Sequence, residues 1–148
     1  MTTGASCLDA MMAAILARAE ADASFVAACA GGLYDAVPPD VSYPYAWVTL
    51  REDPSLVETF ARLGFEVYAL VQVYHRDDTR ESTQVIDQIL GHVARVFHHQ
   101  PGALSPSGWR VTYAGYEGAR PSPNVIEAAS GKVVRSKIGQ LRFIVEAS

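Results

Sequence analysis

The sequence has few of the residues that build redox, metal or membrane sites. Its 148 residues include two cysteines, Cys7 and Cys29, and four histidines. Two cysteines form no disulfide framework, and their spacing matches no zinc motif, so we expect two buried free thiols. No apolar run approaches the roughly 20 residues of a membrane span, and the first residues lack the basic start of a signal peptide. These absences predict a soluble protein made in a cytoplasm, with no membrane partner.

Motifs for catalysis are also missing. There is no GxSxG elbow, no GxGxxG loop and no Walker lysine. His92 and His99 share a helix face but lie about two turns, or roughly 10 Å, apart, which is too far for one metal ion. Asp77 and Asp78 are explained by a helix start, where the helix dipole favours anions. We therefore predict no cofactor, no metal and no enzymatic activity.

Composition is ordinary for a globular protein. Apolar residues make up 49% of the chain and charged residues 19%, with a formal net charge of -4. A chain of this length fits one domain, spanning residues 1–148. The negative net charge gives no global basic field that would attract nucleic acid.

One stretch, Gly64 to Arg76, is the strongest strand signal in the chain. Every second residue from Phe65 to Val73 is apolar, which defines a core face. The opposite face carries Glu66, Tyr68, Leu70, Gln72 and Tyr74. A solvated face would alternate more cleanly, so we predict a central strand whose second face is covered by another subunit or partner.

The remaining elements follow from periodicity and turn residues. Ser6 and Asp22 are predicted N-caps of two helices, and Gly31-Gly32 ends the second. Asp78 and Glu81 form a capping box ahead of the clearest amphipathic helix, Val85 to Phe97. Strands are predicted over Tyr45–Leu50, Trp109–Tyr116 (Trp109, Val111 and Tyr113 on one face) and Val133–Glu146, with a β-bulge at Gly139. Long connections are predicted over Arg51–Leu63, with a turn at Asp53-Pro54, and over Glu117–Asn124, before a short edge strand at Val125-Ile126.

This order mixes helices and strands without regular βαβ alternation. It predicts an α+β fold, with a mostly antiparallel sheet of about four strands and two main helices packed on one face.

Basic residues gather late in the chain. On a strand, Arg135 and Lys137 share one face, near Lys132 and Arg142. Such a group fits either an acidic partner or a solvated edge that resists strand addition.

The order of motifs from Asp22 to Phe97 resembles a known family. A short helix leads into Gly31-Gly32-Leu33-Tyr34-Asp35-Ala36-Val37-Pro38-Pro39, then Tyr43-Pro44-Tyr45-Ala46-Trp47-Val48, a Val-rich strand and an amphipathic helix. The final strand, Leu141 to Glu146, also looks similar. This pattern is similar to the tail-terminator, or tail-completion, proteins of long-tailed bacteriophages and of phage-like gene transfer agents.

The resemblance implies a structural virion protein of the tail or neck, assembled in the bacterial cytoplasm. Such a subunit forms a homo-oligomeric, hexameric ring on the head-proximal end of the tail tube. The ring ends tube polymerisation and joins tail to head, so its expected partners are the tail tube protein and a head-completion or connector protein. DNA would pass through the lumen without sequence-specific binding.

The candidate interface residues come from the second face of the Gly64–Arg76 strand, from the start of the Arg51–Leu63 connection and from the basic group. They are Arg51, Tyr68, Leu70, Tyr74, Arg76, Arg135 and Lys137. Three alternatives stay open: another neck or tail component of similar fold, such as a head-completion or tube-like protein; a small enzyme centred on His75; and a ligand-binding module.

Overall fold

The computed structural model describes residues 6–53, 58–59, 62–76 and 81–148. The main path of the sheet has the strand order β1-β2-β4-β6-β5, and β3 pairs with β4 beside this path. All pairs are antiparallel except β1 with β2. The strands are β1 (Leu33–Tyr34), β2 (Tyr45–Asp53), β3 (Glu58–Thr59), β4 (Arg62–Arg76), β5 (Trp109–Ile126) and β6 (Val133–Ala147).

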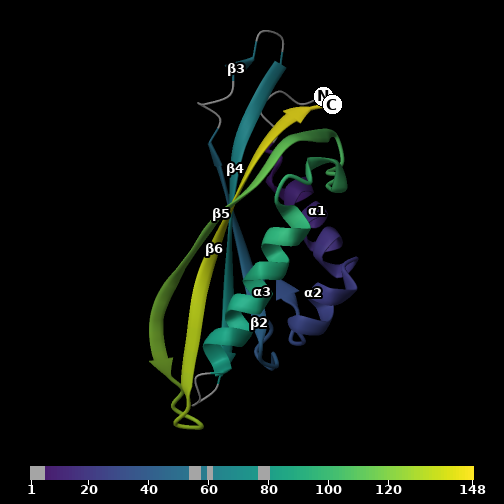
Figure 1. Cartoon of the computed structure of the whole chain (residues 1–148). Helices are drawn as coiled ribbons and strands as arrows, with labels where there is room; N and C mark the ends of the chain where they lie inside the picture. Colours follow the sequence, from purple (N-terminus) through teal and green to yellow (C-terminus); the bar gives the residue numbers. More distant parts are fainter. Residues whose placement is uncertain (1–5, 54–57, 60–61, 77–80) are drawn as a thin grey trace.

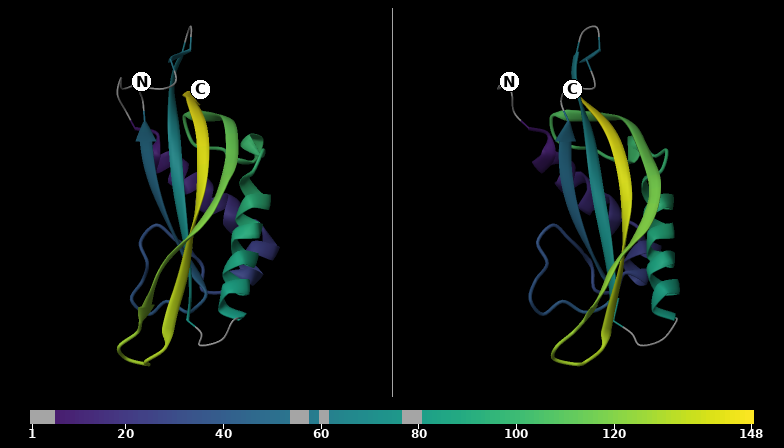
Figure 2. Two further views of the ribbon diagram at one scale, coloured as in Figure 1. Left: turned by 60° about the vertical axis from the view of Figure 1, so that its left-hand side comes forward. Right: turned by 90° about the vertical axis from the view of Figure 1, so that its left-hand side faces the viewer.

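The helices lie together on one side of this sheet, and its other face is bare of helices (Figures 1 and 2). They are α1 (Leu8–Glu20), α2 (Ala23–Ala28), α3 (Glu81–Phe97) and a short 3-10 helix, η2 (Pro101–Ala103). The predicted α+β class is confirmed. The main path has five strands rather than about four, because the two-residue β1 adds to the four long ones.

The core lies between this helical layer and the sheet. Val67, Val71 and Val73 of β4 are fully buried or nearly so. They meet the apolar stripe of α3, which includes Ile86, Ile89, Leu90, Val93, Val96 and Phe97. The period-2 pattern of β4 and the 3.6-residue pattern of α3 thus bury complementary apolar surfaces.

Local signals place the helix ends at or within one residue of the predicted positions. The Asp22 side chain accepts a hydrogen bond from Phe25 N–H at 2.9 Å, as an N-cap does. The N-cap of α1 is Cys7 rather than the predicted Ser6, whose Oγ accepts a hydrogen bond from Leu8 N–H at 3.1 Å from one residue further out. Gly32 adopts a φ of 98°, which only glycine reaches at low cost, as the chain turns from α2 into β1. The turn predicted at Asp53-Pro54 and the capping box of Asp78 and Glu81 involve residues outside the described ranges.

Strand β5 departs most from expectation. The segment Glu117–Asn124, predicted as a loop, belongs to one strand that runs from Trp109 to Ile126. Its prolines are tolerated because β5 is the last strand of the sheet and has an unpaired side. Register shifts interrupt it after Val111, Tyr116 and Ser122.

The first of these shifts also corrects the predicted faces of β5. Val111 pairs with Val145 and is buried, whereas Tyr113 pairs with Ile144 and lies on the opposite face. One extra residue in a bulge reverses the side on which every later side chain points.

The bulge predicted at Gly139 is wrong. Strand β6 pairs with β4 in unbroken register from Val134 to Glu146. Val134 and Ile138 are apolar in the opposite phase to Leu141 and Phe143 because they lie on the face of the sheet away from the helices, without any bulge between. The irregularity is in the neighbouring β5, between Tyr116 and Ala119.

The long connection predicted over Arg51–Leu63 is also partly strand. Strand β2 continues to Asp53, β3 follows, and β4 begins at Arg62. Strands β2 and β4, joined by this segment, pair antiparallel from Tyr45–Tyr74 to Asp53–Glu66, as expected for a mostly antiparallel sheet.

Candidate interaction surface

The side of the sheet away from the helices forms the candidate site, and we call it the open face. Register places alternate residues of β2, β4 and β6 on it, together with Arg110, Tyr113, Arg120, Ser122 and Val125 of β5. Aromatic and arginine side chains dominate, as in the centres of protein interfaces. The members from the three inner strands are Tyr45, Trp47, Thr49, Arg51, Glu66, Tyr68, Leu70, Gln72, Tyr74, Arg76, Val134, Ser136, Ile138, Gln140, Arg142, Ile144 and Glu146.

A buried carboxylate organises one end of the open face. Glu66 is 3% exposed and accepts hydrogen bonds from Arg142 Nε and from the Tyr68 hydroxyl. The bond to Glu66 raises the pKa of Tyr68. Arg51 lies over the Tyr68 ring, with its guanidinium carbon 4.9 Å from the ring centre, and Arg142 lies 5.4 Å from the Tyr113 ring centre. These cation–π contacts fix the Tyr68 and Tyr113 rings next to positively charged guanidinium groups.

The other end of the open face is an aromatic stack beside an ion pair. The Tyr45 and Tyr74 rings stack with centres 4.9 Å apart. Arg76 lies over Tyr43 and forms a 2.7 Å ion pair with Glu127. Hydrogen bonds from Ser130 and then Arg76 lower the pKa of Glu127. These contacts tie the turn after β5 to β4.

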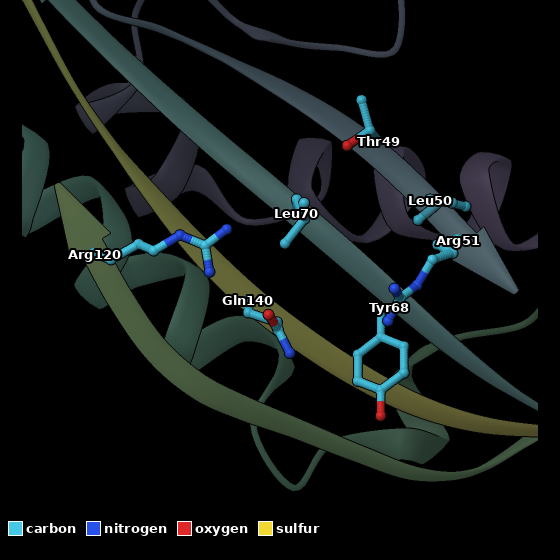
Figure 3. A pocket seen from close by; sticks show the side chains of 7 residues that line it. All are labelled: Thr49, Leu50, Arg51, Tyr68, Leu70, Arg120 and Gln140. Carbon is cyan, nitrogen blue, oxygen red and sulfur yellow. The ribbon is translucent and has the colours of Figure 1, made fainter. Parts of the chain in front are cut away.

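A pocket of about 310 Å³ lies in the open face between β2, β4, β5 and β6 (Figure 3). Arg51 and Arg120 stand at opposite ends of it, with Leu70 between them. The residues that line it include no carboxylate. A recess of mixed polar and apolar lining with a guanidinium group at each end suits an acidic or amide side chain of a partner protein.

The structure brings five of the seven candidate residues together. Arg51, Tyr68, Leu70, Tyr74 and Arg76 all lie on the open face. Arg135 and Lys137 share a face, as expected, but it is the opposite one.

The helix side of the sheet therefore holds the two remaining candidates. Lys137 Nζ forms a 2.7 Å ion pair with Asp87 of α3. Arg135 Nε is buried without a hydrogen-bond partner.

Sequence reasoning missed several members of this surface, among them Tyr45, Trp47, Tyr113, Arg120 and Arg142. Trp47 and Tyr113 are 37% and 36% exposed, although both are large aromatic residues. Arg142 was assigned to the basic group rather than to Tyr68 and Glu66. The signal for Trp47 was its position in β2, two residues after Tyr45 on the same face.

The described residues hold no arrangement that resembles a metal centre. No group of three or more His, Cys, Asp or Glu side chains gathers among them. Burial raises the pKa of Cys7 and of Cys29 to about 11, so both thiols stay protonated and unreactive near neutral pH. Asp77, the carboxylate beside His75 in the enzyme alternative, lies outside the described residues. Within the described ranges, none of the helices has the length and apolar character needed to cross a membrane.

Comparison with solved structures identifies a relative by fold. No protein-family model matches the sequence, and no curated protein does. A chain from the structure described as "Virion of native gene transfer agent (GTA) particle" superposes with a TM-score of 0.75. The alignment covers 96% of this chain and 98% of that chain, at 19% sequence identity.

This chain shares its fold with a chain of a gene transfer agent virion. The alignment spans nearly the whole of both chains, so the likeness includes the helical layer and the open face together. At 19% identity the likeness concerns the fold, and the side chains of the open face have to be judged on their own chemistry.

Proposed function

We propose that this protein is a structural subunit of a phage-like particle, and that it forms the tail-terminator ring at the head-proximal end of the tail tube. In this role it stops tube polymerisation and provides the surface to which the head attaches. The single observation that carries the proposal is the open face, an uncovered aromatic and arginine surface on a fold found in a gene transfer agent virion.

The open face has the properties of a surface made to be covered. Its aromatic rings are held flat by neighbouring rings and guanidinium groups, so little conformational entropy is lost when a partner binds. Its buried charge, Glu66, is already satisfied within the subunit. A partner therefore gains apolar and cation–π contacts without leaving a buried charge unpaired.

Deletion of the gene in a cell that assembles these particles tests the proposal. We expect electron micrographs to show overlong tails or tails without heads, because no ring stops the tube. Supplying the unaltered gene in trans should restore a single tail length. Normal tails attached to heads would refute a terminator role, and complete loss of tails would indicate a tube protein instead.

A further inference from the structure

Charge is divided between the two lateral edges of this protein. Residues 6–50, which form α1, α2, β1 and most of β2, contain five acidic side chains and one basic. Residues 109–148, which form β5 and β6, contain six basic side chains and three acidic. Ion pairs to other segments involve Lys137, Arg142 and Glu127 in the second segment and Asp22 in the first. Apart from these pairs, the first segment keeps four acidic side chains and one basic, and the second keeps four basic and two acidic. In the sheet order β1-β2-β4-β6-β5 the first segment lies at one edge of the sheet, and the second lies toward the other edge, with β5 outermost and β6 beside it. Two copies placed side by side in the same orientation would bring unlike charges together.

The basic edge ends in an exposed apolar projection. Val125 and Ile126, at the end of β5, are 61% and 70% exposed, the two highest values among the large apolar residues that the structure describes. The turn that follows leads to the exposed Lys132. We call Val125, Ile126 and Lys132 the hairpin knob. Figure 1 shows this end of the β5–β6 hairpin projecting on the side away from α1 and α2.

The acidic edge carries a matching recess. A pocket of about 210 Å³ lies between the end of α1, α2 and β1, and we call it the α2 pocket. Phe25, Val26 and Leu33 contribute apolar surface to it, and Val26 is 48% exposed. Glu20 is the one charged residue in its lining.

We propose that the hairpin knob of one copy docks in the α2 pocket of the next, with Lys132 facing Glu20. The contact is heterologous, because each copy uses its basic edge on one side and its acidic edge on the other. Such contacts form a ring when the rotation between copies closes. This inference rests on the proposed function, and it assigns the ring contacts to the lateral edges while the open face remains available to the tube or the head-side protein.

Charge argues against the symmetric alternative. A two-fold dimer through either edge would place like charges opposite each other, which disfavours that pairing. The α2 pocket also contains no cation that could accept an acidic partner segment. A second copy of this chain supplies both the apolar side chains and the charge that the pocket lacks.

Cysteine cross-linking tests the contact inside particles. The variant Val26→Cys with Ile126→Cys is expressed in the deletion strain, particles are treated with a short bis-maleimide, and denaturing gels are read. We expect a ladder of dimer, trimer and higher species. Each single variant is the matched control and should give at most a trace of dimer, because the native Cys7 and Cys29 are buried.

Charge reversal tests the proposed contact between Glu20 and Lys132 without a cross-linker. Glu20→Lys or Lys132→Glu alone should lower the amount of this protein in purified particles by about tenfold, and the two together should restore it to within about threefold. Circular dichroism confirms that each variant folds.

Failure of this contact and failure of the proposed function give different results. A double-cysteine variant that restores normal tail length but gives no ladder, or charge reversals that do not compensate, would overturn the contact and leave the terminator role intact. If the double-cysteine variant gives a ladder but the deletion strain makes normal tails, the contact is supported and the terminator role is refuted.

Discussion

At the scale of single residues, two glycines differ in how much space their surroundings leave for a side chain. A Cβ atom on Gly31 would lie 1.9 Å from the Ser42 backbone oxygen, because the turn after α2 packs directly on the segment before β2. Gly31 N–H also donates to Pro44 O at 2.7 Å, so neither backbone can move away without losing that bond. Gly91, on the exposed side of α3, has nothing within 4 Å of the same position.

The same substitution should therefore have opposite effects at the two sites. Gly31→Ala is expected to lower the free energy of unfolding by about 3 kcal/mol or more, since backbone atoms clash. Gly91→Ala should raise it by up to about 1 kcal/mol, because alanine favours helix. Urea denaturation of both variants checks this, and equal effects at the two positions would contradict the packing described for Gly31.

At the scale of elements, one carboxylate joins α2 to α3. Asp22 caps α2 and also binds Arg95 of α3 through two hydrogen bonds, of 2.7 and 3.0 Å. These bonds from Arg95, followed by the bond from Phe25 N–H, hold the pKa of Asp22 well below its usual range. A lowered folded-state pKa gives stability that is present above the unfolded pKa, about 3.9, and is lost as the pH falls through the folded value.

Replacing the Asp22 carboxylate should make the stability of the protein fall less steeply as the pH is lowered. Asp22→Asn keeps a good N-cap but loses the ion pair, so we expect lower stability than the natural chain at pH 7 and a smaller difference below about pH 4. Thermal melts between pH 2 and pH 7 measure this, with Asp40→Asn as an exposed control on the loop before β2. A difference that does not narrow in acid would show that Asp22 contributes through something other than its charge.

The elements also show where sequence reasoning succeeds and fails. Strand β4 and helix α3 are predictable because an uninterrupted period of 2 or 3.6 reports a single buried face. Strand β5 is not predictable in this way, because each bulge changes the phase of its apolar alternation. Its prolines, which an edge strand tolerates, are also typical of loops.

Prediction of the candidate site also depended on regular alternation along the strands. Four of the five open-face candidates lie on β4, where alternation is reliable. The fifth, Arg51, was expected in a connection and belongs to β2. Arg135 and Lys137 could have been placed by carrying the phase of Leu141 and Phe143 back without a bulge, which puts them on the helix side.

At the scale of the whole molecule, the open face should matter for assembly more than for folding. Replacing Tyr68 and Tyr74 with Ser removes one aromatic stack, one cation–π contact and the hydrogen bond from the Tyr68 hydroxyl to Glu66, together worth about 2–4 kcal/mol to the subunit. If these rings anchor the partner, each contributes about 2 kcal/mol or more to binding, so incorporation into particles should fall at least tenfold.

Tyr→Phe changes at the same two positions are the matched control. They keep both rings and should assemble nearly as the natural chain does, whereas the Ser variant should fold but remain outside particles. Quantifying the protein in purified particles, with circular dichroism on the free subunit, separates the two effects. Normal incorporation of the Ser variant would remove the open face from the assembly surfaces.

The position of β6 has a consequence for how the protein is made. It follows every other strand in the sequence, yet it lies between β4 and β5 and pairs with β4 from Gly64 to Arg76. While a ribosome is still producing this segment, the backbone groups on that side of β4 have no partner, and an unpaired edge invites wrong pairing. The central strand is therefore completed by a segment synthesised after it, so the subunit cannot present a finished sheet to a growing particle until β6 has emerged.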